Sequence, residues 1–121
     1  MTQTDTETGQ TLALALDAID QLKGESIITL DVSQLTTIAE HMVICSGRSA
    51  RHVKSISDSV AEQARTAGLQ PRIEGLEQAE WVLIDLNGVI IHILQPMARA
   101  HYQIEKLWDI DVTAAEQRQN N

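Results

Sequence analysis

The feature that most constrains this chain is a pair of apolar segments separated by only two residues. Residues 81–86 read Trp-Val-Leu-Ile-Asp-Leu and residues 89–94 read Val-Ile-Ile-His-Ile-Leu, with Asn87-Gly88 between them. Asn-Gly favours a two-residue hairpin turn, because both central positions of that turn need a positive φ. The sequence therefore predicts an antiparallel β-hairpin.

The two-residue turn also determines which side chains share a face of the hairpin. One face is wholly aliphatic: it pairs Val82 with Ile93, Ile84 with Ile91, and Leu86 with Val89. The other, which we call the mixed face, pairs Trp81 with Leu94, Leu83 with His92, and Asp85 with Ile90. We expect helices to pack on the aliphatic face.

Two interpretations of the mixed face stay open at this point. An aromatic side chain among aliphatic residues, with charge at the rim, is typical of a protein interface. Alternatively, Trp81 and Leu83 lie in a second, minor core under the last helix of the chain. The first interpretation places the mixed face against a partner, and the second places it inside the domain.

The remaining pattern predicts one α/β domain over residues 10–112, between a disordered segment at 1–9 and a flexible tail at 113–121. Helical spacing of apolar residues runs from Leu12 to a C-cap at Gly24, and again from about Ser49 to Ala67. Apolar runs predict strands at 26–32 and 42–45 and a short edge strand at 72–74, and Pro96 begins a last helix that reaches about Trp108. The expected fold is a single mixed sheet of about five strands with the two longer helices on one face.

Charge and composition narrow the class of partner. The chain carries 17 Asp and Glu against 9 Lys and Arg, a formal charge of -8. Phosphate contacts need a basic surface, so this balance argues against a general nucleic-acid binder and favours a basic protein partner. Solubility alone is the plainer explanation of the same charge.

The compartment is predicted from what the sequence lacks. A single cysteine, Cys45, excludes an internal disulfide and fits a reducing environment. The start of the chain does not resemble a signal peptide, and no apolar run approaches the ~20 residues that span a bilayer. We therefore expect a cytoplasmic protein with no membrane contact.

We predict no catalytic centre and no cofactor. Asp85 and His92 are diagonal neighbours on the mixed face, but the hairpin supplies no nucleophile beside them. The four histidines and Cys45 lack the spacing of metal ligands. The only Asp-x-Asp, Asp109-Ile110-Asp111, falls near the C-terminal tail and away from any turn suited to nucleotide chemistry.

One turn is a candidate anion site. Ser46-Gly47-Arg48-Ser49 leads into a helix whose first residues include Arg51 and Lys54. Backbone N–H groups and basic side chains at a helix N-terminus suit an anion, so Arg48, Arg51 and Lys54 are candidates for contact with an anion or RNA. A solvated surface patch is the alternative.

An ordered set of motifs over roughly residues 12 to 109 resembles the ribosomal silencing factor family, also called the Iojap-related family. The motifs that carry the resemblance are Leu30-Asp31-Val32, Met42-Val43-Ile44-Cys45-Ser46-Gly47, Ser49-Ala50-Arg51-His52-Val53, Glu74-Gly75, Trp81-Val82-Leu83-Ile84-Asp85, His92 and Tyr102-Gln103-Ile104-Glu105-Lys106-Leu107-Trp108. The sequence departs from the family's usual residues at two places. His41-Met42 stands where the family usually has an aromatic pair ahead of the second strand, and Asn87-Gly88 stands where its hairpin turn is often Gly-Asp.

The resemblance implies a fold related to nucleotidyltransferases without their catalytic carboxylates. It also implies binding to ribosomal protein fourteen of the large subunit, which blocks joining of the small subunit and represses translation under nutrient limitation. Matched by position, the partner-binding segment contains Trp81, Asp85 and His92, while Tyr102 and Trp108 are expected to be packing residues. From their place on or beside the hairpin we add Leu83, Glu77 and Glu80 to the candidate contacts.

Two other function classes stay open from the residues alone. One is a nucleotide-binding enzyme of the nucleotidyltransferase type that uses the Ser46–Ser49 turn. The other is an adaptor that forms a homodimer through the mixed face. A minor contact with ribosomal RNA, through Arg48, Arg51 and Lys54, is compatible with the ribosomal reading.

Overall fold

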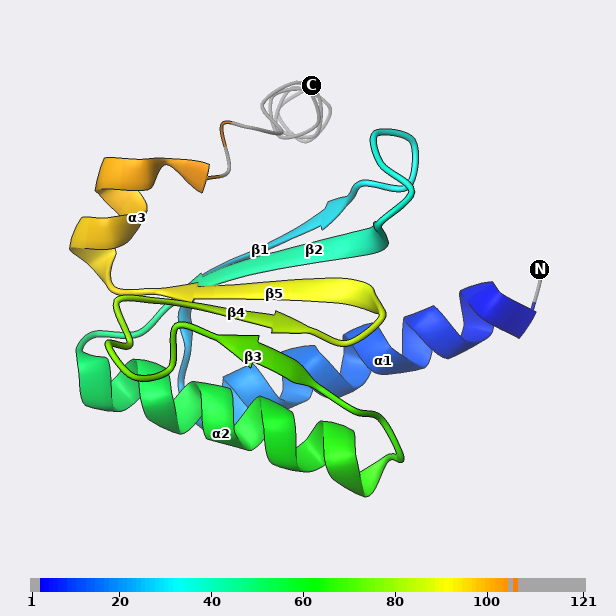
Figure 1. Cartoon of the computed structure of the whole chain (residues 1–121), viewed down its shortest axis with the longest axis horizontal. Coiled ribbons are helices and arrows are strands. Elements are labelled where there is room, and N and C mark those ends of the chain that lie inside the picture. The colour runs from blue at the N-terminus through cyan, green and yellow to red at the C-terminus, as the bar shows by residue number, and fades with distance from the viewer. Residues whose placement is uncertain (1–2, 105, 107–121) are drawn as a thin grey trace.

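The computed structural model describes residues 3–104 and residue 106, which form a sheet with helices on both faces (Figure 1). The elements in chain order are α1 (Gln3–Gln21), β1 (Glu25–Asp31), β2 (Ala39–Ser46), α2 (Ala50–Thr66), β3 (Arg72–Glu74), β4 (Trp81–Asp85), β5 (Gly88–Leu94) and α3 (Pro96–Tyr102). The five strands lie in the order β1-β2-β5-β4-β3. β2 and β5 are parallel, and every other neighbouring pair is antiparallel, so the predicted mixed sheet is confirmed.

The hairpin has the predicted register. Ile84 pairs with Ile91 and Leu83 with His92, and the N–H of Leu86 donates to the carbonyl of Val89. Asn87 and Gly88 have φ angles of 60° and 106°, the left-handed values that this turn requires. The aliphatic and mixed faces of the hairpin are therefore those expected from the sequence.

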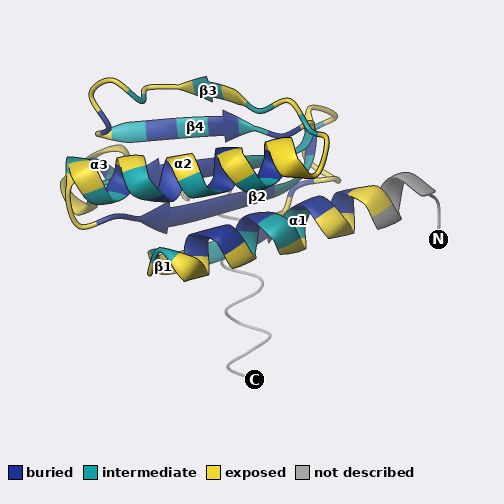
Figure 2. Cartoon of the chain, turned by 90° about the horizontal axis from the view of Figure 1, so that it is seen from below, coloured by how far each residue is buried: buried dark blue, intermediate teal, exposed yellow. Residues whose placement is uncertain are grey.

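The aliphatic face packs under the two longer helices, as predicted. Helices α1 and α2 lie side by side below the sheet in Figure 1, and Figure 2 shows buried residues alternating with exposed ones along both. The side chains that they enclose with the sheet form one large cluster whose members include Ile19, Val43, Ile56, Val60, Val82, Ile84, Ile91 and Ile93. This cluster is the main core of the domain.

A second, smaller cluster lies on the opposite face of the sheet. Ile44 of β2 and Leu94 of β5 pack there with Ala98 of α3 and with Ile104. Trp81 and Ile90 contact the cluster from the side and are only partly buried. The short helix α3 therefore covers one end of the mixed face, and within residues 3–104 and 106 no helix covers the rest of it.

The N-terminal boundary differs from the expectation. The sequence predicted a disordered segment over residues 1–9, whereas helix α1 begins at Gln3. Thr8 and Thr11 are buried although their segment is polar, and Thr8 lies against Gly88 at the hairpin turn. Helix α1 therefore extends past the hairpin turn, and its contact there is one that no local pattern reveals.

The last helix is shorter than predicted. Helix α3 ends at Tyr102, because Gln103 adopts a left-handed conformation with a φ of 48° and its N–H donates to the carbonyl of Arg99. The chain then turns so that Ile104 reaches the second cluster. Trp108, the Asp109–Asp111 motif and the tail at 113–121 lie outside the described residues.

Candidate protein-binding surface

The uncovered part of the mixed face is a strip along β4 and β5. Leu83, Asp85 and Ile90 point away from the main core and are each partly exposed. His92, on the same face, is only 5% exposed because it lies nearer the end that α3 covers. The mixed face is thus a minor core at the end that α3 covers and a partly exposed surface at the other end, where the interface interpretation stays a prediction.

Trp81 connects the two ends. Its indole Nε1–H donates to Nδ1 of His92 at 2.9 Å, and its ring lies 4.9 Å from the ring of Tyr102, centre to centre. Tyr102 is 49% exposed and also makes an edge contact with His101. Tyr102 was expected to be a packing residue, but it is half-exposed beside a partly exposed tryptophan, so it belongs to the candidate surface.

Burial determines the chemistry of His92. Loss of water around the ring lowers the pKa of His92 from 6.5 to about 4, so the imidazole is neutral near pH 7. Since Nδ1 accepts the indole N–H, the single proton of the neutral ring is assigned to Nε2. His92 therefore acts as a neutral acceptor that orients Trp81.

Asp85 and His92 do not form the pair that the hairpin register allowed. An Asp85 carboxylate oxygen accepts the backbone N–H of Asn87 at 2.8 Å, and this bond stabilises the turn. The acceptor nitrogen of His92 bonds to Trp81 instead. Asp85 therefore stabilises the hairpin turn, whereas His92 orients Trp81.

Acidic residues border the Trp81 end of this surface. Glu77 and Glu80 are exposed in the short connection from β3 to β4. That connection folds back tightly at Gly75, which has a φ of 85° and where a Cβ would collide with the backbone carbonyl of Trp81. The glycine therefore allows the start of this connection to lie against the backbone of Trp81.

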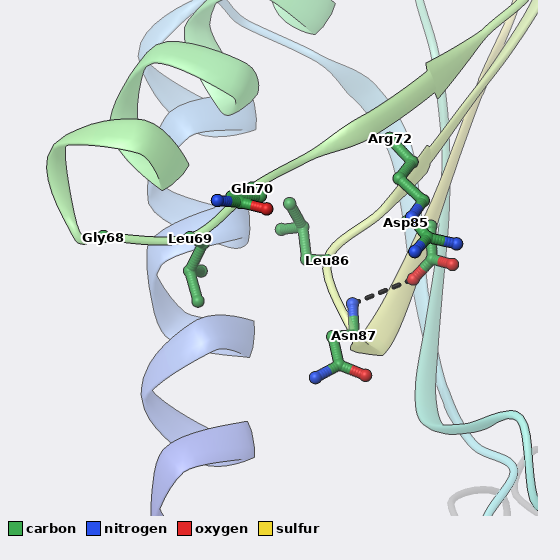
Figure 3. Close-up of a pocket in the computed structure, with 7 residues that line it drawn as sticks. All are labelled: Gly68, Leu69, Gln70, Arg72, Asp85, Leu86 and Asn87. Carbon is green, nitrogen blue, oxygen red and sulfur yellow. Dashed lines mark hydrogen bonds between the residues drawn. The ribbon is translucent and has the colours of Figure 1, made fainter.

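The surface continues around the tip of the hairpin into a recess of about 450 Å³ (Figure 3). The recess is lined by Gly68, Leu69, Gln70, Arg72, Asp85, Leu86 and Asn87. Arg72 of β3 stands opposite Asp85 of β4 across the strand pair. Asp85 thus belongs to both the mixed face and the recess, and Arg72 and Gln70 are neighbouring polar groups that the sequence did not single out.

The Ser46–Ser49 turn is built differently from an open anion site. The Ser49 hydroxyl accepts the N–H of His52, and Nδ1 of His52 accepts the N–H of Arg48 at 2.9 Å. Nε2 of His52 bonds to the carbonyl of Leu22 at 2.7 Å and so ties α2 to the end of α1. Two N–H groups that an anion would use are thus already bonded, whereas the side chains of Arg51 and Lys54 extend into solvent.

Cys45 lies in the main core and is not poised for chemistry. Burial raises the pKa of the Cys45 thiol to about 12, which keeps it protonated and unreactive at neutral pH. Within residues 3–104 and 106, no three His, Cys, Asp or Glu side chains gather in a way that could hold a metal ion. In the same residues, no helix combines the length and apolar character needed to cross a membrane.

The fold is that of a small α/β domain in which two helices bury one face of the sheet, while the other face is partly exposed and carries Trp81 with two acidic residues beside it. Residues 5–121 match the model of the RsfS family, described as "Ribosomal silencing factor during starvation". The chain belongs to this family, which confirms the resemblance seen in its sequence motifs.

Individual relatives agree with the family assignment. A "Ribosomal silencing factor RsfS" from Halalkalibacterium halodurans is 40% identical over 98 residues, which span 80% of this chain and 84% of the relative. A crystal structure of a Chromobacterium violaceum protein superposes with a TM-score of 0.81 at 38% identity, covering 84% of this chain and 85% of that one. A mouse relative, "Mitochondrial assembly of ribosomal large subunit protein 1", is 24% identical over 101 residues, 80% of this chain and 44% of the relative.

Proposed function

We propose that this protein silences ribosomes by binding the large subunit through its ribosomal protein fourteen and thereby blocking attachment of the small subunit. Membership of the silencing factor family carries the ribosomal part of the proposal. The name of the mouse relative supports the choice of the large subunit. The action is steric and needs no catalysis, and it would lower translation in the cytoplasm when nutrients are limiting.

The candidate surface suits such a partner in its chemistry. Ribosomal proteins are generally basic, and Glu77 and Glu80 supply negative charge at the aromatic end of the mixed face, while Asp85 supplies it at the hairpin-turn end. Trp81, Tyr102 and Leu83 supply apolar area of the kind found at the centres of interfaces. We therefore assign the contact to the mixed face, its acidic border and Tyr102.

Charge reversal at the border tests this assignment. Glu77 and Glu80 are exposed, so the double variant Glu77→Lys/Glu80→Lys should fold normally but associate more slowly and bind large subunits more weakly. The matched control is Asp58→Lys/Glu62→Lys, which changes the same amount of charge at exposed positions of α2, on the helical face. Sedimentation with separated subunits measures both affinities.

The expected result is wild-type protein in the large-subunit fraction, with a loss of binding for the border variant that exceeds the loss for the α2 variant. Wild-type protein found with the small subunit, or with neither, would contradict the proposed function. Equal losses for the two variants would remove the acidic border from the contact and leave only a general effect of net charge.

A further inference from the structure

The acidic connection from β3 to β4, residues 75–80, lies beside the start of α3 (Figure 1). Both segments are at the end of the sheet where β5 terminates, since Trp81 at the start of β4 pairs with Leu94 at the end of β5. The next residue along the chain, Gln95, is the N-cap residue of α3. Gln95 therefore stands between the connection that carries both border carboxylates and the helix that carries Tyr102.

Gln95 is hydrogen-bonded to both of these segments. Its backbone N–H donates to the carbonyl of Glu80 at 3.0 Å, and its side-chain Nε2 donates to the carbonyl of Ala79 at 3.0 Å. Its own carbonyl accepts the N–H of Arg99 in the first turn of α3 at 3.0 Å. An N-cap side chain usually accepts an N–H of its own helix, but in the described part of the chain the Gln95 side chain makes no such bond. Its amide bonds to the connection instead.

Ala79 adopts a backbone conformation that needs support from its surroundings. Its φ is 54°, in the left-handed region that residues with a Cβ rarely occupy. Its methyl group is fully buried in the main core, and its N–H donates to the carbonyl of Gly75 at 2.9 Å. The amide of Gln95 adds a contact from outside the connection. Loss of that amide removes one of the interactions that hold this strained conformation in place.

We propose that Gln95 is a positioning residue for the partner-binding surface, because its amide fixes the backbone from which Glu77 and Glu80 project. The inference rests on the proposed function, since it explains how the acidic border of that surface is kept in one arrangement. Attraction between an exposed carboxylate and a basic partner depends on where the carboxylate lies as well as on its charge. A connection that is already ordered also loses less conformational entropy on binding.

Removal of the amide tests the inference. Gln95→Met keeps the length of the side chain and removes the donor, so it should bind large subunits about threefold to tenfold more weakly. Gln95→Asn is too short to reach Ala79 but is a favoured N-cap residue, so it should bind as weakly while α3 stays capped. The matched control is Gln63→Met, which removes the amide bond from Gln63 to Gln21 on the helical face and should bind as the wild type does. Sedimentation with large subunits measures all four affinities.

A double-mutant cycle shows whether Gln95 acts through the carboxylates. Glu77→Gln/Glu80→Gln removes both charges with little change in shape, so the position of the connection then matters less. In this background Gln95→Met should weaken binding by about twofold or less. Equal factors in the two backgrounds, with the wild type bound, would overturn the positioning role and leave the proposed function intact. Failure of the wild type to bind large subunits would overturn the proposed function and the positioning role together.

Hydrogen exchange measures the order of the connection without the ribosome. The N–H of Ala79 should exchange at least about threefold faster in Gln95→Met than in the wild type, because the connection opens more often. The N–H of Leu86, which donates to the carbonyl of Val89 beyond the other end of β4, should keep its rate. Acceleration of both N–H groups by the same factor would mean that Gln95 stabilises the whole domain alike, and would overturn the positioning role.

Discussion

Truncation of Trp81 to alanine should weaken both folding and binding. The indole packs beside the second cluster, contacts Tyr102 and donates to the buried His92, so its removal leaves a void and an unpaired acceptor. We expect a loss of roughly 2–4 kcal/mol in the free energy of unfolding, toward the lower range for a tryptophan because the side chain is partly exposed. Affinity for large subunits should fall by about 2 kcal/mol or more.

Two further variants separate the structural from the binding contribution. Trp81→Phe keeps an aromatic ring beside Tyr102 but leaves the buried Nδ1 of His92 without its donor, so it should cost about 1–3 kcal/mol of stability. Leu83→Ala, in the uncovered strip, should reduce binding with a smaller loss of stability than Trp81→Ala. Urea unfolding measures the stability of each variant. Binding to large subunits is then measured by sedimentation, under conditions in which every variant is folded. Full binding by folded Trp81→Ala would assign Trp81 to the second core alone.

Acid should destabilise the domain through His92 as the pH falls below about 6.5. The pKa of His92 is about 4 in the folded protein and 6.5 in the unfolded chain, so the unfolded chain binds the additional proton between these values. The contribution of His92 is complete above pH 6.5 and is lost as pH falls toward 4. Over the whole interval the loss is about 3 kcal/mol, since each pKa unit corresponds to about 1.4 kcal/mol.

The matched control is His92→Asn, whose amide oxygen provides an acceptor near the position of Nδ1 without titrating. Urea unfolding at pH 7 and pH 5 gives the pH dependence of stability for both proteins. Wild type should lose distinctly more stability than His92→Asn between these two pH values. Equal losses in the two proteins would show that His92 titrates normally and is not desolvated in the folded state.

The sequence predicts the parts of this fold that depend on local patterns. Asn87-Gly88 determines the hairpin register, and the 3.6-residue spacing from Val53 to Ala64 identifies the buried side of α2. The alternation along the hairpin separates the aliphatic face from the mixed face. These predictions hold because turn chemistry and side-chain period act over a few residues.

The rest depends on contacts between distant segments. No local pattern shows that β2 pairs with β5 in parallel, that α1 begins at Gln3, or that Thr8 packs against Gly88. The same holds for the candidate surface. The hairpin register suggested that Asp85 and His92 could contact each other. In the structure Asp85 instead accepts the backbone N–H of Asn87, and His92 accepts the indole N–H of Trp81. Tyr102 reaches Trp81 only because α3 folds across the sheet.

The proposed function is that this protein prevents ribosomal subunits from joining by occupying the large subunit. Its most direct test is sedimentation of separated subunits mixed in the presence of increasing amounts of the protein. The fraction of joined ribosomes should fall in proportion to occupancy of the large subunit, and Glu77→Lys/Glu80→Lys should require a higher concentration for the same effect. Added to ribosomes that are already joined, the protein should act much less, because the site is then covered. Normal joining at a concentration that saturates the large subunit would contradict the account.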